Sequence, residues 1–204
     1  MFENVIGAEL AACVEFTAEA DKLKQIFRRT MLTAKNRREN DAEHSWHLAL
    51  MAAVFAKFAP QADAVRAMRM VIVHDLVEIY AGDTFAYDTE GNSSKKEREL
   101  AAADRIFSIL PCDIGSELRG LWEEFEECKT DDAVYAASLD RFSPLLNNHL
   151  TDGVTWVEGN VTASQVYKRM EPIKRGIPPL WPAVEEIIRN GVEKGYIRED
   201  RADA

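Results

Sequence analysis

The sequence predicts an all-α protein built as a multi-helix bundle. Apolar residues recur at spacings of three and four along nearly the whole chain, which is the period of a helix buried on one side. No segment shows the sustained alternation of apolar and polar residues that is typical of a half-buried strand. The 204 residues contain no composition break that would mark a linker. We therefore expect one domain, 1–204, with a core at about 23–150.

The first half of the chain is expected to form three helices, at about 6–32, 41–58 and 63–80. Asn40 and Asp41 are good N-cap residues for the second helix, and Pro60 ends it. The third helix is apolar on most sides, which places it in the middle of the fold. The apolar stripes of the second and third helices are, respectively, His44, Leu48, Met51, Val54, Phe55 and Phe58, and Val65, Met68, Ile72, Leu76 and Ile79.

The second half begins with a loop, "AGDTFAYDTEGNSSKK", whose glycines and polar residues disfavour regular structure. Helices follow to about residue 110 and at 114–128. Thr130 is a cap for the next helix, in which Pro144 should produce a kink or a boundary. "TDGVTWVEGN" is expected to be a loop, with or without a short strand-like piece. Two further helices, at 162–170 and 182–196, should pack on the core.

Composition narrows the function classes. The net charge of −10 disfavours binding to a nucleic-acid backbone, because no basic excess can displace its counterions. It leaves room for a small phosphorylated substrate, since a metal and one or two arginines supply local positive potential. The three cysteines are far apart and form no C-x-x-C motif, which disfavours zinc ribbons and disulfide frameworks. With no apolar run long enough for a bilayer, we expect a cytoplasmic protein with reduced thiols and no membrane partner.

Four residues have the side chains of a divalent metal site, namely His44, His74, Asp75 and Asp140. Imidazole and carboxylate groups together bind such metals with open coordination positions, which suits hydrolysis. The adjacent His74 and Asp75 lie in an apolar stretch, where an ionised carboxylate needs a cation or a hydrogen-bond network. A His–Asp pair bonded to a neighbouring helix end is the structural alternative. His47 could replace His44 as the ligand, or pack in the core.

Further polar residues flank these four. Glu78 is four residues after His74, so a continuous helix would place both on one face. Asp83 follows Gly82, which indicates either a turn or a reactive carboxylate beside the metal. Arg28 and Arg29 are either solvated surface residues or a bidentate site for phosphate.

Four segments together carry a family resemblance: "LKQIFRRT", "RRENDAEHSWHLALMA", "VIVHDLVEIYAGDTFAYD" and "AASLDRFSPLL". They resemble the HD-domain metal-dependent phosphohydrolases, and most closely the branch related to the 5′-deoxynucleotidases. The resemblance implies a helical bundle with a central metal site. It implies that one divalent metal (Mn, Co, Fe, Ni, Zn or Mg) is held by His44, His74, Asp75 and Asp140.

The same resemblance implies that Glu78 and Asp83 are the acid–base residues and that an arginine in "FRRT" binds phosphate. Counting back from the first histidine without a gap gives Arg29, and a small gap gives Arg28. In the deoxynucleotidases a bulky aromatic residue that is thought to exclude the ribose 2′-hydroxyl follows this arginine. Here Arg29 or Thr30 takes the place of the aromatic residue, so the resemblance does not decide whether deoxynucleotides are preferred over ribonucleotides.

The expected activity is hydrolysis of nucleoside 5′-monophosphates, ribo or deoxy, to nucleoside and phosphate. One alternative keeps the site but changes the substrate to a phosphodiester, a dNTP or an alarmone. Another is a non-catalytic, metal-stabilised helical module that binds proteins. Three tryptophans indicate apolar surface beyond the needs of a small core, and relatives are commonly dimeric, so we expect a homodimer. They are Trp122, Trp156 and Trp181.

Overall fold

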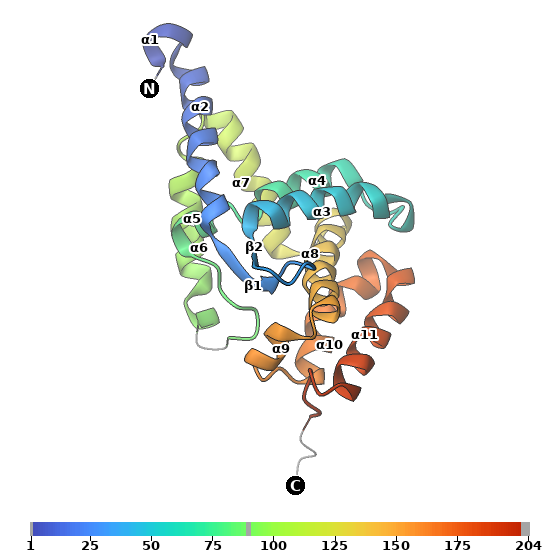
Figure 1. The fold of residues 1–204 in the computed structure, drawn as a ribbon. Helices are drawn as coiled ribbons and strands as arrows, with labels where there is room; N and C mark the ends of the chain where they lie inside the picture. The colour runs from blue at the N-terminus through green and yellow to red at the C-terminus, as the bar shows by residue number, and fades with distance from the viewer. Residues whose placement is uncertain (1, 89–90, 201–204) are drawn as a thin grey trace.

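The computed structural model describes residues 2–88 and 91–200, and it confirms an all-α bundle (Figure 1). The helices are α1 (Glu3–Ile6), α2 (Ala8–Ala20), α3 (Asp41–Phe55), α4 (Ala64–Val73), α5 (Glu78–Ala81), α6 (Lys95–Phe107), α7 (Cys112–Glu127), α8 (Asp131–Leu150), α9 (Val154–Glu158), α10 (Ala163–Gly176) and α11 (Trp181–Glu193). The strands are β1 (Phe27–Met31) and β2 (Arg38–Asn40). Single 3₁₀ turns cover Asp21–Gln25, Ala56–Phe58, Gly91–Ser93 and Pro178–Leu180.

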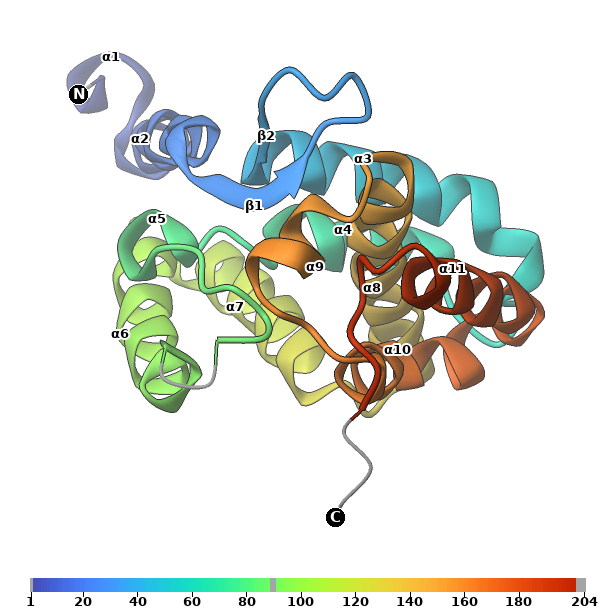
Figure 2. The same cartoon turned by 60° about the horizontal axis from the view of Figure 1, so that its bottom comes forward.

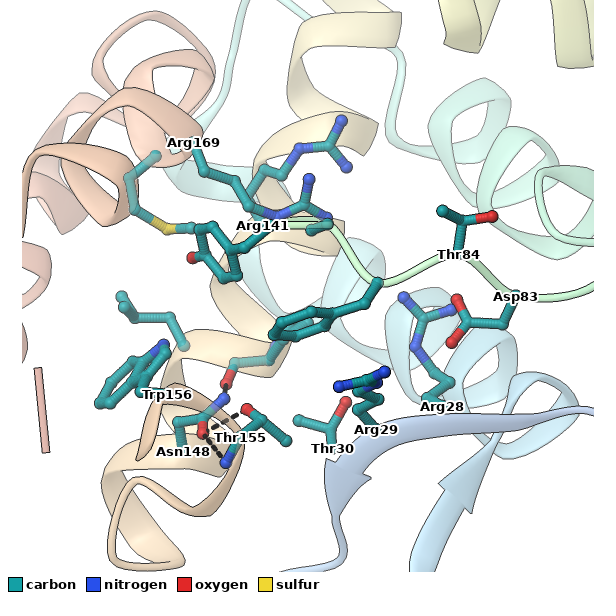
Figure 3. A pocket seen from close by; sticks show the side chains of 16 residues that line it. Arg28, Arg29, Thr30, Asp83, Thr84, Arg141, Asn148, Thr155, Trp156 and Arg169 are labelled. Atoms are coloured by element: carbon teal, nitrogen blue, oxygen red, sulfur yellow. Dashed lines mark hydrogen bonds between the residues drawn. The ribbon is translucent and has the colours of Figure 1, made fainter. Parts of the chain in front are cut away.

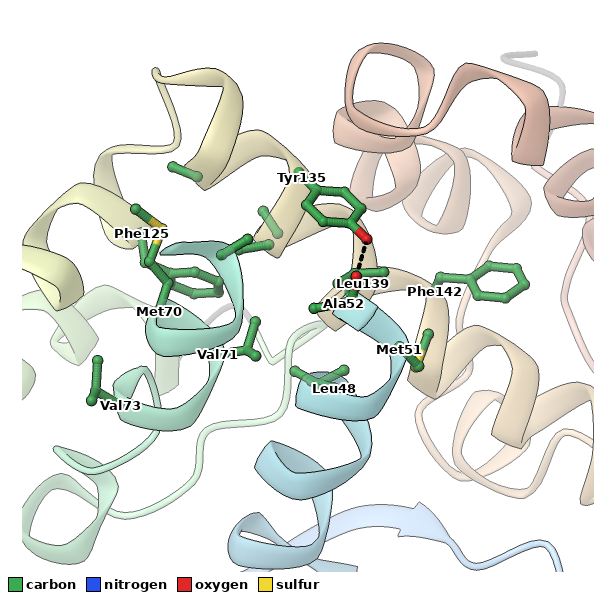
Figure 4. Packing of buried hydrophobic residues seen from close by; sticks show 14 of the residues in the cluster. Leu48, Met51, Ala52, Met70, Val71, Val73, Phe125, Tyr135, Leu139 and Phe142 are labelled. Carbon is green, nitrogen blue, oxygen red and sulfur yellow. Dashed lines mark hydrogen bonds between the residues drawn. The ribbon is translucent and has the colours of Figure 1, made fainter. Parts of the chain in front are cut away.

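Helix α8 is the centre of the bundle. It packs against α3, α4 and α7 on one side and against α10 and α11 on the other, as Figures 1 and 2 show. Its residues from Ala133 to Asp140 are all buried. Where α8 crosses α3, the Tyr135 hydroxyl donates a hydrogen bond to the Ala52 carbonyl at 2.7 Å, beside the fully buried Leu48 and Leu139 (Figure 4). The helix that carries Asp140 is therefore fixed by packing on both sides.

The expected helix at 6–32 is wrong in its last third. Helix α2 ends at Ala20, and after one 3₁₀ turn the chain becomes β1, which pairs antiparallel with β2. Successive side chains of a strand point to opposite faces. Along β1, Arg28 is accordingly directed inward while Phe27 and Arg29 are exposed. The hairpin, which no alternation pattern indicated, thus distinguishes the two neighbouring arginines.

The expected helix at 63–80 is interrupted. Helix α4 ends at Val73, residues 74–77 form a turn, and α5 starts at Glu78. The expected stripe on this helix was also wrong in part, because Val65 and Ile72 are 67% and 49% exposed. The buried face consists of Ala67, Met70, Val71 and Val73. When apolar residues lie on most sides of a helix, their spacing predicts the helix but does not show which face is buried.

Two expectations for the second half also need correction. Pro144 does not mark a helix boundary, because α8 continues through it to Leu150, and the expected alternative, a kink, stays a prediction. A proline cannot donate to the carbonyl four residues earlier, but packing on both sides of α8 outweighs that loss. The segment 151–160, expected to be a loop, contains α9. The capping of α8 by Thr130 is confirmed by a side-chain hydrogen bond to the first turn, and Thr162 caps α10 in the same way.

The tryptophans do not form the apolar surface we expected. Trp122 and Trp156 are 3% and 2% exposed and belong to the core, whereas Trp46 on α3 is 67% exposed. The homodimer therefore stays a prediction without this support. In the described parts of the chain, no helix combines the length and apolar character that a bilayer crossing requires.

Candidate metal centre

His44 and Asp140 meet at the middle of the bundle. His44 lies in the first turn of α3, where Asn40 and Glu43 form a reciprocal capping box that fixes the start of the helix. Its Nε2 lies 2.9 Å from Asp140 Oδ1, and its Nδ1 lies 3.4 Å from Glu39 Oε2. Both His44 and Asp140 are almost completely buried. Two residues 96 positions apart in the sequence therefore share one site.

His74 and Asp75 reach the same site from the turn after α4. His74 Nε2 lies 3.1 Å from Asp75 Oδ1 and 3.7 Å from Asp140 Oδ1. His44, His74 and Asp75 each offer a ligand atom within 4.8 Å of the others. Because the helix is interrupted here, the idea that His74 and Glu78 share a helical face was wrong. The sequence contains no glycine or proline at this break, so tertiary contacts must produce it.

These residues fit a divalent cation. His74 Nδ1 lies 2.9 Å from the Val71 carbonyl, which can only accept, so Nδ1 carries the proton. The lone pair of Nε2 then faces the Asp75 and Asp140 oxygens and has no hydrogen-bond partner in the described structure. A lone pair against anionic oxygens is repulsive unless a proton or a metal lies between them. Two imidazoles and two carboxylates around one point are suitable ligands for such a metal.

Arg28 connects this cluster to a second group of acids. One of its terminal nitrogens lies 2.7 Å from Asp75 Oδ2 and 3.2 Å from Asp41 Oδ1. Its other terminal nitrogen lies 3.8 Å from Asp140 Oδ1. Asp41, Asp75 and Glu78 form a second set of converging carboxylates. Arg28 is thus a buried cation that contacts both groups of acids.

The pKa shifts in the site reflect several buried carboxylates that lie close together. Burial raises the pKa of Asp41 to about 7, and the Asp75 carboxylate adds to the rise while Arg28 opposes it. Burial also raises the pKa of Glu78 well above its ordinary value, again with help from Asp75. Burial and Arg28 oppose protonation of His44, but hydrogen bonds to Asp140 and Glu39 nevertheless raise its pKa to about 9. The cluster therefore retains protons in the absence of another cation.

Asp83 and Arg29 lie in a pocket next to the cluster (Figure 3). Burial raises the pKa of Asp83 as well, partly offset by Arg28. The Arg29 guanidinium lies 4.8 Å from the centre of the Phe85 ring. Of the two arginines left open by the sequence, Arg28 contacts the buried acids, while Arg29 is exposed at the pocket.

The structure adds residues that the sequence did not indicate. Glu39 and Asp41 are buried in the site, although Glu39 resembles an ordinary polar residue before the cap at Asn40, and Asp41 was expected only to help begin the helix. Arg141, which follows Asp140 directly, forms an ion pair with it. His47 is half-buried and stacks on Trp46, with ring centroids 6.3 Å apart, outside the metal-ligand group. Only the fold could reveal Glu39 and Asp41, whereas Arg141 was predictable from its neighbour.

Comparison with known proteins identifies the family. The model of the HD domain matches residues 20–181. The chain belongs to the HD-domain family. A predicted metal-dependent phosphohydrolase from Magnetospirillum magnetotacticum MS-1 superposes with a TM-score of 0.87 at 44% identity, covering 93% of this chain and 98% of that one. The PH0347 protein of Pyrococcus horikoshii OT3 has a TM-score of 0.60 at 23% identity over 86% of this chain and 98% of its own, which supports the HD-domain fold alone.

Sequence relatives of this HD-domain protein include the enzymes named 5′-deoxynucleotidase HDDC2. The human enzyme is 33% identical over 110 residues, covering 54% of this chain and 53% of its own. The mouse enzyme is 32% identical over 108 residues, covering 53% of each chain. The match spans only about half the length of these relatives. It confirms the resemblance to the deoxynucleotidase branch of the HD-domain phosphohydrolases.

Proposed function

We propose that this protein is a metal-dependent phosphohydrolase that hydrolyses nucleoside 5′-monophosphates to nucleoside and phosphate. The observation that carries the proposal is the convergence of His44, His74, Asp75 and Asp140 beside a buried arginine and a pocket. The named activities of the HDDC2 relatives and of the Magnetospirillum protein support the same reaction class.

The four converging side chains would hold one divalent metal, of which Mn, Co, Fe, Ni, Zn and Mg are candidates. When bound, this metal supplies a Lewis acid and an acidified water near neutral pH. Because its Nδ1 donates to the Val71 carbonyl, His74 would offer Nε2 to the metal. Glu39, whose Oε2 lies 3.4 Å from His44 Nδ1, would orient the His44 ring from its outer side.

The chain's own acids would move the protons. Glu78 is buried beside Asp75 and does not line the pocket, which favours a role in orienting or deprotonating the attacking water. Asp83 does line the pocket, and its raised pKa helps it to hold a proton. Asp83 would protonate the nucleoside oxygen as its bond to phosphorus breaks. Arg28 would neutralise the phosphoryl oxygens, and the two acid roles could be exchanged.

A substrate screen tests the proposal. The purified protein is analysed for metal content, stripped with a chelator and assayed for phosphate release from ribo- and deoxynucleoside 5′-monophosphates with each candidate metal. We expect turnover that chelation removes and one metal restores. Chelation should also lower the melting temperature by roughly 5–10 °C, because a ligand at 100 times its Kd stabilises by about 2.7 kcal/mol. A melting shift without turnover on any phosphate compound would favour the non-catalytic module.

A further inference from the structure

The pocket beside the metal centre is unusually basic for this chain. The protein has a net charge of −10, yet four arginines and one acid, Asp83, line the pocket. The proposed function uses Arg28, and Arg29 lies over an aromatic ring at the pocket. The remaining two, Arg141 on α8 and Arg169 on α10, have no role in it.

Arg169 is the more informative of the two. It is a half-buried residue on the inner side of α10, and neither a salt bridge nor a hydrogen bond joins it to any residue in 2–88 or 91–200. Burial and the nearby positive charge of Arg141 together lower the pKa of Arg169 to about 10, although the Asp140 carboxylate opposes the shift. Two other basic residues of α10 have partners, since Lys174 binds Glu171 and Arg175 binds Asp131. A buried cation without its own anion is costly, so an anion from outside the chain would be stabilised here.

Arg141 does not compensate this charge. Its one ion-pair partner in the described structure is Asp140, which is also a proposed metal ligand and which lies near Arg28 as well. Figure 3 shows Arg141 and Arg169 together on the side of the pocket away from Arg28 and Asp83. Two guanidinium groups and one shared carboxylate leave an excess of positive charge on this side.

The basic side also continues outward. A second hollow of about 420 Å³ adjoins the pocket and shares Tyr87, Arg141 and Arg169 with it. Gln165 and Lys168 complete the polar part of its lining. The pocket itself has about 60 Å³, and the second hollow adds space along Arg141 and Arg169 where a second charged group could lie.

We propose that Arg169 and Arg141 form a second phosphate subsite, so that the preferred substrates are nucleotides that carry an additional phosphate besides the one that is hydrolysed. Guanidinium groups bind phosphate oxygens in a bidentate manner, and a neighbouring arginine pair suits the two negative charges of a terminal phosphate. This inference rests on the proposed function for the position of the first phosphate. The inference goes beyond the proposed function because it assigns a second phosphate to the side of the pocket formed by Arg141 and Arg169.

The test compares binding of nucleotides that differ in one phosphate. Isothermal titration is performed in an Asp83→Asn background, which slows turnover, with adenosine 5′-monophosphate, adenosine 5′-diphosphate and adenosine 3′,5′-bisphosphate. We expect at least one doubly phosphorylated compound to bind about ten-fold more tightly than the monophosphate, a gain that one charge-assisted contact can supply. The preferred compound also shows where the second phosphate lies.

Adding Arg169→Gln should remove this preference and change the affinity for the monophosphate by less than about two-fold. Arg175→Gln is the matched control, since it is the same substitution on the same helix outside both hollows, and it should retain the preference. A melting curve checks folding, and Arg169→Gln should melt no lower than its parent. The proposal is overturned if Arg169→Gln weakens all three nucleotides equally, or if the parent shows no preference. Absence of turnover with an intact preference would contradict only the proposed function.

Discussion

On one side of the pocket, Arg28 is a single cation that contacts Asp41 and Asp75 close to Glu78. On the other side, Arg141 and Arg169 lie together, and the one carboxylate near them, Asp140, is paired with Arg141. Burial beside other carboxylates raises the pKa of Asp41 and Glu78 on the first side. Burial beside Arg141 lowers the pKa of Arg169 on the second. On each side, buried groups of like charge repel one another and have lost water, so each side is stabilised by a ligand of the opposite charge. The contrast teaches that the acidic side is suited to a metal cation and the basic side to an anion.

The largest effect is expected from removing a ligand on the acidic side. Asp75→Asn should abolish metal binding and reduce phosphate release by about 10³-fold or more, because a metal contributes several kcal/mol to the transition state. Elemental analysis and a phosphate-release assay measure both effects. Asp113→Asn, an exposed carboxylate on α7, is the control. Full activity of Asp75→Asn after chelation would exclude the proposed centre.

The next prediction compares the stability of the two sides. In the metal-free protein, Arg28→Gln should lower the free energy of unfolding by roughly 3 kcal/mol, because it leaves buried carboxylates without their cation. Protonation of Asp41, whose pKa is about 7, would relieve part of this cost below neutral pH. Arg169→Gln should leave the free energy of unfolding about unchanged, since no described ion pair is lost. Urea unfolding at pH 8 measures both, and equal losses would contradict the charge contrast.

A kinetic comparison separates the two arginines that the sequence could not. Arg28→Gln should reduce kcat/KM for the best mononucleotide by about 100-fold, the size expected when a charge-stabilising donor is lost. Arg29→Gln should reduce it by less than about five-fold, because an exposed contact with the Phe85 ring is worth at most about 1 kcal/mol. The assays are run well below each variant's melting temperature. A larger loss for Arg29→Gln would assign the phosphate to Arg29.

The smallest effect concerns the outer support of the metal centre. Glu39→Gln should weaken metal affinity by roughly ten-fold, because Glu39 orients the His44 ring from its far side. Competition with a metal-binding dye measures the Kd, and Glu43→Gln, which alters only the capping box and the Arg37 ion pair, is the control. An unchanged Kd would show that the capping of α3 alone positions His44.

Local signals in the sequence were sufficient for much of the fold. The residues that cap α3, α8 and α10 were recognisable because a cap depends on side chains within one turn of the helix. The hairpin was not, since β1 and β2 are stabilised by pairing across a turn and show no alternation. The break after Val73 was also missed, because it depends on where His74 and Asp75 find partners.

The sequence by itself determined the helical class, most helix starts and the four candidate ligands, since these depend on residue type and on spacing within a few positions. The tertiary structure alone decided that Arg28 and not Arg29 lies among the acids. That depends on which face of β1 each side chain occupies, and no sequence pattern predicted this strand. The tertiary structure also decided that Arg169, in the ordinary helical segment "VYKRM", lies beside the metal centre without a described ionic partner. Burial and charge compensation are properties of the surroundings, and the surroundings of a side chain come mainly from residues far away in the sequence.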